Sequence, residues 1–351
     1  MKKKMIISII ILLLSIVFAI FNYSNLGANP KGARLERIKK SPNYRDGQFQ
    51  NLHETPMNPS GKSFYKIALS FITEKKNPNR IPIDSVPAVQ TDLTQLDLSK
   101  NQIVWFGHSS YLLVLDGKKI LVDPVFSSSF PGSLMMKPFK GTNIYSPNDM
   151  PNIDILIITH DHYDHLDYKT VKQIKNRVSK VVCPLGVGAH FEKWGYLSDC
   201  IEELDWYEKT MVEGLTMNCT PTRHFSGRFI KRNPTLWASF ILESKKDTIF
   251  IGGDGGYDDF YKKIGEKYNI DLAIIENGQY DENWCYIHTM PQYLQQLIHD
   301  LKPKKVMGVH NSKFSLSRHA WKEPIDNLNN IAKRDSSFQL ISSQIGEITI
   351  L

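Results

Sequence analysis

The stretch ILIITHDHYDHLDYKT, residues 155–170, decides the fold. Its first residues belong to an apolar run, Ile153 to Ile158, that predicts a fully buried strand. Directly after this run, four ligand-type residues occupy six positions in the pattern HxHxDH, namely His160, His162, Asp164 and His165. Neutral imidazole and carboxylate are the groups that bind zinc and similar divalent metals. We therefore predict a metal-binding turn here rather than a charged surface loop, with Asp167 as the cap of the helix that follows.

Three further ligand-type residues follow other predicted strands. His224 lies in TPTRHFSGR, Asp254 in FIGGDGGYDDF and His310 in GVHNSKF. Each comes just after an apolar run, and α/β folds build their sites at the carboxyl ends of strands. The complete set is five histidines and two aspartates, which suffices for two metal ions with one carboxylate bridging them.

The rest of the pattern mixes strands with helices. Apolar runs bounded by turn residues predict strands over Tyr111–Leu115, Lys119–Val122, Lys180–Cys183, Leu215–Thr220, Ala238–Glu243, Asp247–Ile251, Leu272–Ile275, Lys305–Val309 and Glu347–Leu351. Helical segments are predicted over Tyr168–Asn176, Gly188–Trp194, Phe260–Lys267, Pro291–Leu301 and Pro324–Arg334. This mixture favours sheets that are covered by helices.

The N-terminus carries three lysines and then an apolar run, Met5 to Phe21. As a helix this run would be about 25 Å long, the short end of a transmembrane span and the long end of a signal-peptide core. The best cleavage site, around Leu26 to Ala28, lies well past the run, so we predict an uncleaved anchor. Basic residues flank the run on both sides and leave the orientation in the membrane open. We divide the chain into an anchor or uncleaved signal (1–22), an N-terminal arm (23–95) that is either extended or wraps around the domain, and a catalytic domain (96–351).

Composition limits the function classes. The 351 residues are 41% hydrophobic, which suits a sizeable folded core, and the formal net charge is +7. The positive charge is not gathered into an arginine-rich block with aromatics near the predicted site, so nucleic acid is not expected as a partner. A membrane and a lipid or small-molecule substrate are the expected partners, and a homodimer is left open.

THDHYDHLD resembles the signature of metallo-β-lactamase-fold hydrolases. The chain is most similar to the branch that contains N-acyl-phosphatidylethanolamine-hydrolysing phospholipase D and its bacterial relatives. The similarity runs from about Ser41 to Leu351 and includes WFGHSSYLL, LVDPVF, TPTRHFSGR, FIGGDGGY and HTMP. It implies an α/β fold, specifically a four-layer αβ/βα sandwich, with two divalent metal ions in a cleft at one edge. Zinc is the expected metal.

The resemblance also implies roles for individual residues. His160, His162 and His224 would bind the first metal; Asp164, His165 and His310 would bind the second; and Asp254 would bridge them. A metal-bridging hydroxide would be the nucleophile, and His288 would contact the substrate phosphate. Asp123 and His108 are expected to support ligands. We assign ordinary surface or packing roles to His53, His190 and His299.

Five polar residues depart from the family pattern: Glu276, Asn277 and Gln279, and then Asn311 and Ser312. We expect them near the substrate entrance, which leaves the substrate open. The first hypothesis is a membrane-anchored phosphodiesterase of phospholipase D type that acts on N-acyl phospholipids or related lipids. The second is a lactonase or esterase similar to L-ascorbate-6-phosphate lactonase. The third, from another class, is a non-catalytic binding module tethered to the membrane.

Overall fold

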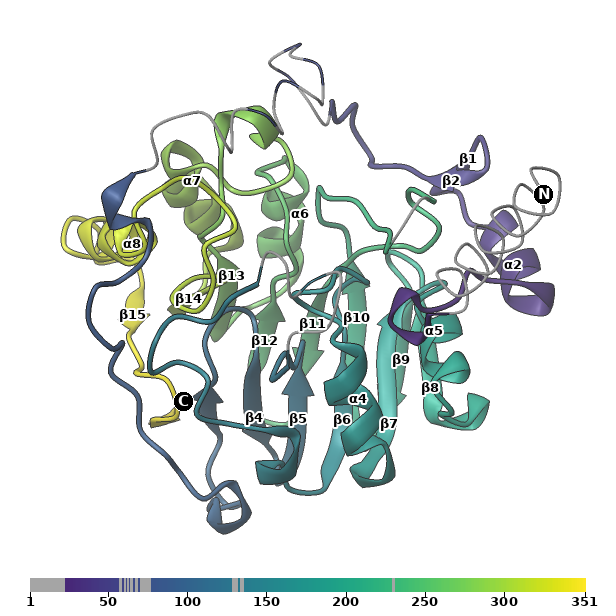
Figure 1. The fold of residues 1–351 in the computed structure, drawn as a ribbon, viewed down its shortest axis with the longest axis horizontal. Helices are drawn as coiled ribbons and strands as arrows, with labels where there is room; N and C mark the ends of the chain where they lie inside the picture. The colour runs from purple at the N-terminus through teal and green to yellow at the C-terminus, as the bar shows by residue number, and fades with distance from the viewer. Residues whose placement is uncertain are drawn as a thin grey trace, which may run out of the picture.

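The computed structural model in Figure 1 describes residues 23–56, 77–127, 136–228 and 231–351, together with residues 59, 61, 63, 66, 69 and 132. Two seven-stranded sheets form the domain. The predicted anchor, Met5 to Phe21, lies outside the described residues. Within the described ranges, no helix is both long enough and apolar enough to span a bilayer.

The first sheet has the strand order β16-β3-β4-β5-β6-β7-β8. Strands β5 to β8 run parallel, and β16, β3 and β4 pair antiparallel. Its strands are β3 (Gln102–Trp105), β4 (Tyr111–Leu115), β5 (Lys118–Val122), β6 (Ile153–Ile157), β7 (Val178–Pro184), β8 (Ile201–Leu204) and β16 (Ile348–Ile350), and helices α4 (Tyr168–Ile174) and α5 (Gly188–Lys193) follow β6 and β7.

The second sheet has the order β15-β14-β13-β12-β11-β10-β9. Strands β12 to β15 run parallel, and β9 to β12 pair antiparallel. Its strands are β9 (Lys209–Val212), β10 (Leu215–Thr220), β11 (Ser239–Glu243), β12 (Thr248–Ile251), β13 (Leu272–Glu276), β14 (Lys305–Val309) and β15 (Gln339–Ile341), with helices α6 (Phe260–Lys267), α7 (Pro291–Leu301) and α8 (Glu323–Ala332).

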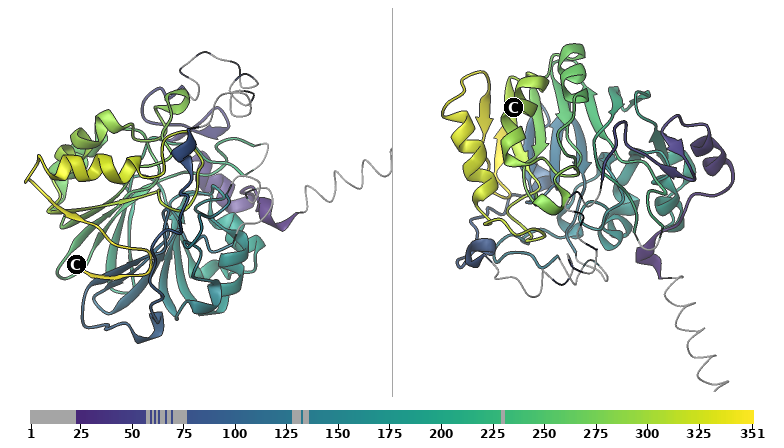
Figure 2. Two further views of the ribbon diagram at one scale, coloured as in Figure 1. Left: turned by 60° about the vertical axis from the view of Figure 1, so that its left-hand side comes forward. Right: turned by 90° about the horizontal axis from the view of Figure 1, so that it is seen from above.

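Alternate residues along a strand point to opposite faces of its sheet, and both faces are covered in the layered arrangement that Figure 2 shows. In β4, Tyr111 and Leu113 pack into the core between the two sheets, whereas Leu112 and Val114 face the layer that contains α4 and α5. In β11, Phe240 likewise faces the central core. Because both faces of these strands are buried, their sequences are continuously apolar rather than alternating. The predicted fold of two sheets covered by helices is confirmed.

The N-terminal arm is more structured than expected. It holds helix α2 (Gly32–Lys39) and a two-residue hairpin of β1 (Tyr44–Arg45) and β2 (Gln48–Phe49). Ile38 and Phe49 are fully buried in the central core. The Arg34 guanidinium lies 2.6 Å from Glu203 and 2.7 Å from Glu192, which fixes α2 to the first sheet. This part of the arm therefore packs against the domain as a wrapping segment, the alternative to an extended arm that sequence analysis left open.

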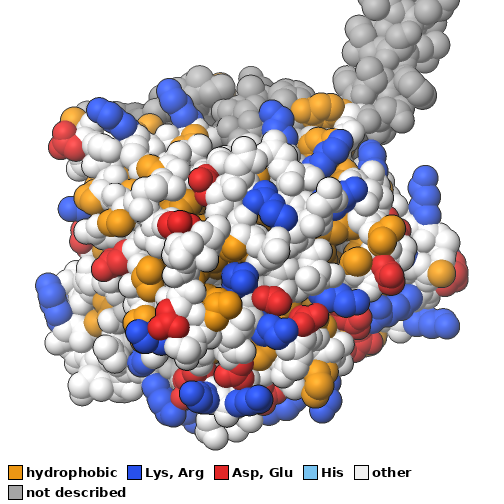
Figure 3. All heavy atoms as spheres, turned by 90° about the horizontal axis from the view of Figure 1, so that it is seen from below, with side chains coloured by type: hydrophobic (Ala, Val, Ile, Leu, Met, Phe, Trp, Pro, Cys, Tyr) orange, Lys and Arg blue, Asp and Glu red, His pale blue; other side chains and the backbone are white. Residues whose placement is uncertain are grey.

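Figure 3 shows the face seen from below, where Lys and Arg side chains are interspersed with Asp and Glu. No block of one sign dominates this face. On this face the two signs of charge are mixed, as on an ordinary solvated surface.

Candidate metal centre

The predicted ligands follow strands whose carboxyl ends lie at one edge of each sheet. The turn with His160 to His165 follows β6, His224 follows β10, Asp254 follows β12 and His310 follows β14. The two edges are joined by backbone hydrogen bonds: His108 N donates to Asn311 O at 2.9 Å, and His310 N donates to His108 O at 3.0 Å. The loops of both sheets therefore meet, and ligands separated by 150 positions converge.

Several non-glycine residues at this junction have left-handed backbone conformations, among them His108, Asp123 and His310. The φ angles are 53° for His108, 40° for Asp123 and 65° for His310. Such angles are uncommon for residues with a side chain, and they persist only where the surroundings impose them. The two backbone bonds between His108 and the His310 loop supply part of that constraint.

The first cluster consists of three histidine nitrogens. His162 Nδ1 lies 2.9 Å from His160 Nε2 and 3.1 Å from His224 Nε2. Nitrogens bound tetrahedrally to one zinc ion are about 3.3 Å apart, given a Zn–N bond of about 2.0–2.1 Å. The cluster therefore has nearly the spacing of a three-histidine metal site.

Hydrogen bonds on the outer side of these rings turn the lone pairs inward. His224 Nδ1 lies 2.8 Å from the Ile287 carbonyl, which only accepts, so Nδ1 carries the hydrogen and Nε2 is left with its lone pair. Burial, together with neighbouring histidines, lowers the pKa of His160 and His224 well below the ordinary value. Both rings are thus held neutral, the form in which imidazole binds a metal.

The second cluster lies beside the first. The side chains of Asp164, His165 and His310, with His108 behind them, bring potential ligand atoms within 4.8 Å of one another. His165 Nε2 lies 3.7 Å from Asp164 Oδ2. Burial would lower the pKa of His165, but the carboxylates of Asp254, Asp164 and Asp123 outweigh it and raise this pKa well above normal. A site that favours a positive charge on His165 also favours a cation.

Asp254 lies between the two clusters. Its Oδ2 is 3.1 Å from His165 Nε2, 3.8 Å from His160 Nε2 and 3.9 Å from His224 Nε2, and its Oδ1 is 3.2 Å from His310 Nδ1. The side chain is buried, and Oδ1 makes no hydrogen bond to any residue that the structure describes. A buried carboxylate oxygen without a hydrogen bond is costly. Coordination of a cation would satisfy it, so the residues present fit metal binding.

Asp123 and His108 lie where the sequence analysis placed supporting residues. Asp123 Oδ2 is 2.7 Å from His165 Nδ1 and also accepts from Thr159 Oγ1 at 2.6 Å. His108 Nε2 lies 3.0 Å from Asp164 Oδ2. A carboxylate that fixes the tautomer of a histidine is a common support for metal sites.

Replacement of Asp123 by alanine is expected to lower metal affinity and turnover by about 10–100-fold, the usual effect of losing such a support. The variant leaves His165 Nδ1 without its carboxylate, so that the ring is free to rotate. Metal titration and steady-state kinetics would measure the loss. Asp92→Ala, at an exposed aspartate, is the control; equal behaviour of the two variants would contradict the supporting role.

His288 lies at the edge of the clusters. Its ring centroid is 5.2 Å from those of both His224 and His310. His288 Nδ1 is 3.1 Å from Glu276 Oε2, and Glu276 Oε1 accepts from Thr289 N at 2.6 Å. Burial would lower the pKa of His288, but the Glu276 carboxylate outweighs burial and raises it. Glu276 thus orients this ring, a role that sequence analysis missed.

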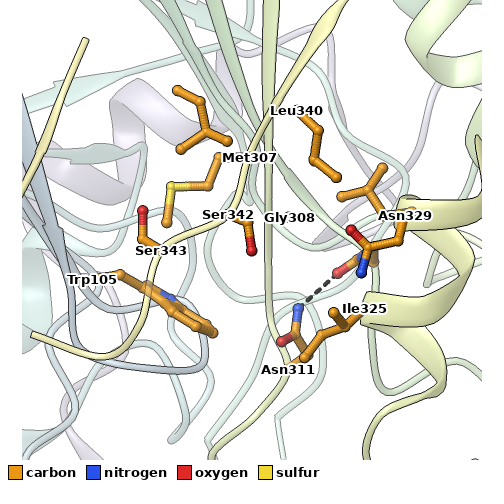
Figure 4. Close-up of a pocket in the computed structure, with 12 residues that line it drawn as sticks. Trp105, Met307, Gly308, Asn311, Ile325, Asn329, Leu340, Ser342 and Ser343 are labelled. Carbon is orange, nitrogen blue, oxygen red and sulfur yellow. Dashed lines mark hydrogen bonds between the residues drawn. The ribbon is translucent and has the colours of Figure 1, made fainter. Parts of the chain in front are cut away.

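The other polar departures do not line the entrance. Asn277, Gln279, Asn311 and Ser312 are buried. Asn311 Nδ2 donates to Asn277 Oδ1 at 2.7 Å, shown by the dashed line in Figure 4, beside a pocket between β14 and α8. Gln279 Nε2 donates to Phe314 O at 3.1 Å. The expectation was wrong because these side chains point behind the His310 loop and brace it.

His190 has the packing role rather than the surface role of the two that sequence analysis left open. It is 3% exposed, and its Nε2 lies 3.2 Å from Asp161 Oδ2 rather than at the surface. Asp161, inside the HxHxDH turn, and Arg228, in TPTRHFSGR, are buried as well and were missed. Both residues lie within the quoted motifs, but their partners are far away in sequence. Their place in these motifs is the signal in the sequence that could have indicated a role.

Comparison with known proteins agrees with this geometry. Residues 118–311 match the family model described as "Beta-lactamase superfamily domain", and this range contains all seven predicted ligands. An uncharacterised protein of Mycobacterium tuberculosis is 35% identical, covering 86% of this chain and 82% of its own. The mitochondrial N-acyl-phosphatidylethanolamine-hydrolyzing phospholipase D of Saccharomyces cerevisiae is 32% identical, over 65% of this chain and 51% of that protein.

A solved structure shows the same fold. Igni18, a metallo hydrolase from the archaeon Ignicoccus hospitalis, superposes with a TM-score of 0.55 at 17% identity, covering 72% of this chain and 98% of its own. At that identity the likeness concerns the fold alone. Since the family model covers more than half of the sequence and the histidine and aspartate clusters can hold metal, this chain belongs to the beta-lactamase superfamily as one of its metal-dependent hydrolases.

Proposed function

We propose that the protein is a binuclear metal-dependent phosphodiesterase of phospholipase D type, which hydrolyses N-acyl phospholipids or related lipids. The observation that carries this proposal is the position of Asp254, whose two oxygens face different histidines at the junction of two ligand clusters. The similarity to the yeast phospholipase D supports the substrate class. Anchoring through Met5 to Phe21, which would place the site beside lipid, and a homodimer stay predictions.

The proposed ligands are divided between two ions. The first ion would be held by the three nitrogens at 2.9–3.1 Å spacing, and the second by the cluster around His165, with Asp254 shared. Zinc suits this set of imidazole and carboxylate ligands. The first ion would be bound by His160, His162 and His224, and the second by Asp164, His165 and His310.

The protein's own residues would prepare the site. Two bound divalent ions lower the pKa of a water and stabilise the attacking and leaving oxygens of a displacement. Asp123 and His108 would keep His165 and Asp164 oriented. Since Glu276 is bonded to Nδ1 of His288, the nitrogen left to meet a substrate phosphate is Nε2.

A substrate panel tests the proposal. The metal-loaded protein would be given N-acyl phospholipids, simple phosphodiesters and lactones at matched concentrations. We expect the highest kcat/KM with N-acyl phospholipids. Preference for lactones would contradict the proposal in favour of a lactonase, and absence of turnover with metal bound would favour a non-catalytic module.

On the same panel, His288→Ala is expected to lower kcat/KM for phosphodiesters by about 10–100-fold, the effect of losing one hydrogen bond to a charged group. Lactones, which lack the phosphate, should be affected much less. His299→Ala is the matched control, because His299 pairs with Asp335 and its side chain is 46% exposed. Equal losses for both substrate classes would argue against phosphate contact.

A further inference from the structure

The first described residues of the chain pack behind the metal-binding turn. We call residues 24–28 the entry segment. Trp194 Nε1 donates to Ser24 O at 2.7 Å, Lys193 Nζ donates to Gly27 O at 2.6 Å, and Ala28 N donates to His190 Nδ1 at 2.9 Å. The entry segment is thus bonded to α5 and the residue after it at several points, directly after the predicted anchor.

One connection runs from the entry segment to the ligands through His190. Because His190 Nδ1 accepts from Ala28 N, its hydrogen is on Nε2, which donates to Asp161 Oδ2 at 3.2 Å. Asp161 is completely buried, lies between His160 and His162 in sequence, and also accepts from Gly227 N at 2.7 Å. Docking of the entry segment therefore fixes the tautomer that holds Asp161.

A second connection runs through Arg228, which is 4% exposed. Its Nη1 donates to the carbonyls of Asp161 at 2.7 Å and Leu166 at 2.8 Å, the two ends of the metal-binding turn. Its Nε and Nη2 donate to the carbonyl of Asn25 at 3.0 and 2.8 Å, and Nη2 lies 3.1 Å from Asn25 Oδ1. The same guanidinium thus bonds the metal-binding turn and the entry segment.

The burial of Arg228 makes the two sets of bonds interdependent. A buried guanidinium needs all its donors satisfied, because an unpaired donor bears the full cost of its desolvation. If Asn25 leaves, Arg228 must reorient toward solvent or toward other acceptors, and its bonds to Asp161 O and Leu166 O would be strained or lost. The metal-binding turn would then lose support at both ends.

We propose that the entry segment is a positioning latch for the metal-binding turn. When it is docked, His190 and Arg228 hold His160 and His162 in the geometry that binds the first ion. When it is displaced, the turn loosens and that ion is held more weakly. This inference rests on the proposed function in one respect, namely that His160 and His162 bind the first metal ion. It also requires the active chain to keep residues 24–28, because cleavage after Ala28 would remove Asn25.

Gly27 gives a sharp test in the full-length chain. A Cβ at Gly27 would overlap His190 Nδ1 and lie 2.7 Å from its Cε1, at a φ of +69°. Gly32 is the matched control, because its φ is +56° and an added Cβ would meet nothing within 4 Å. Both alanine variants impose left-handed strain, but only Gly27→Ala pushes the entry segment off His190.

The readouts are the visible absorption spectrum and the affinity for cobalt(II), loaded in place of the native metal, together with the melting temperature. We expect Gly27→Ala to weaken cobalt binding by about 10–100-fold, as loss of an outer support does, and to alter the spectrum. Gly32→Ala should match the wild type. Trp194→Phe, which removes one bond to Ser24 without adding bulk, should give a smaller shift and remains informative if Gly27→Ala does not fold.

Hydrogen exchange at residues 24–28 shows whether the entry segment has been displaced. A Gly27→Ala protein with faster exchange there, but with the cobalt affinity and spectrum of the wild type, would overturn the latch. An unchanged Trp194→Phe protein with the same faster exchange would do so too. By contrast, a wild-type chain that binds two ions and hydrolyses no phosphodiester would refute the proposed function and leave the latch result intact.

Discussion

Asp254→Ala is expected to lower kcat by about 10³-fold or more, the upper range for loss of one central electrostatic group in an active site. Asp254 is a carboxylate whose oxygens lie within 4 Å of histidines from both clusters. Its removal would deprive the two proposed ions of a shared ligand and leave four histidines without the carboxylate between them. Steady-state kinetics of the purified variant measure the loss of turnover, and metal analysis measures the loss of bound metal.

Asp259→Ala is the matched control for this variant. Asp259 lies in the same loop after β12, but its side chain is 60% exposed and pairs with Lys263. It should retain wild-type turnover and metal content. Wild-type turnover of Asp254→Ala would refute the bridging role. Circular dichroism would show whether Asp254→Ala folds. If it does not fold, Asp254→Asn separates a specific effect on turnover from a loss of the fold.

Removal of the metal is expected to abolish turnover, and the return of zinc to restore it. The clusters are buried and combine imidazoles with acidic side chains, the ligands that zinc prefers. Binding to the folded state alone also stabilises it, by about 4 kcal/mol at a metal concentration 1,000 times Kd. The melting temperature should therefore fall on chelation and rise again with zinc.

Dialysis against a strong chelator, followed by activity and thermal-melting measurements, tests this expectation. Dialysis in buffer alone is the control for losses during handling. Full turnover in protein shown to be free of metal would refute the mechanism. Acidification should release metal from the first cluster less readily than from ordinary histidines, because burial keeps the pKa of His160 and His224 low and these rings remain neutral, and able to bind metal, below the usual range.

Sequence patterns predicted the parts of the fold that are apolar and long. The bounds of β10, β14, α6 and α7 agree with the structure because their apolar positions match the buried faces. Strands β8 and β9 were missed, since Glu202 and Glu203 interrupt one and Lys209 begins the other. Pairing with a neighbouring strand, rather than local composition, decides such edge segments. Helix α2 was missed because contacts with residues far away in sequence, such as those of Arg34 with Glu192 and Glu203, stabilise it.

The site was predictable where a residue follows a strand. His224, Asp254 and His310 were found because each ends an apolar run, and the structure brings them together with the HxHxDH turn. Asp161 and Arg228 were missed because their roles depend on partners that are not near in sequence, such as Asn25 for Arg228. Glu276 was expected near the substrate entrance, and its bond to His288 was missed. The sequence also does not predict the direction in which a side chain points after the end of a strand. For this reason Asn311 was placed at the substrate entrance, whereas its side chain bonds Asn277.

Anomalous X-ray diffraction at the zinc absorption edge, from crystals of the metal-loaded protein, tests the central claim most directly. The account predicts two peaks, one about 2.0–2.1 Å from nitrogens of His160, His162 and His224, and one beside Asp164, His165 and His310, with an Asp254 oxygen near both. A map without peaks there, or with a single peak that Asp254 does not contact, would contradict it.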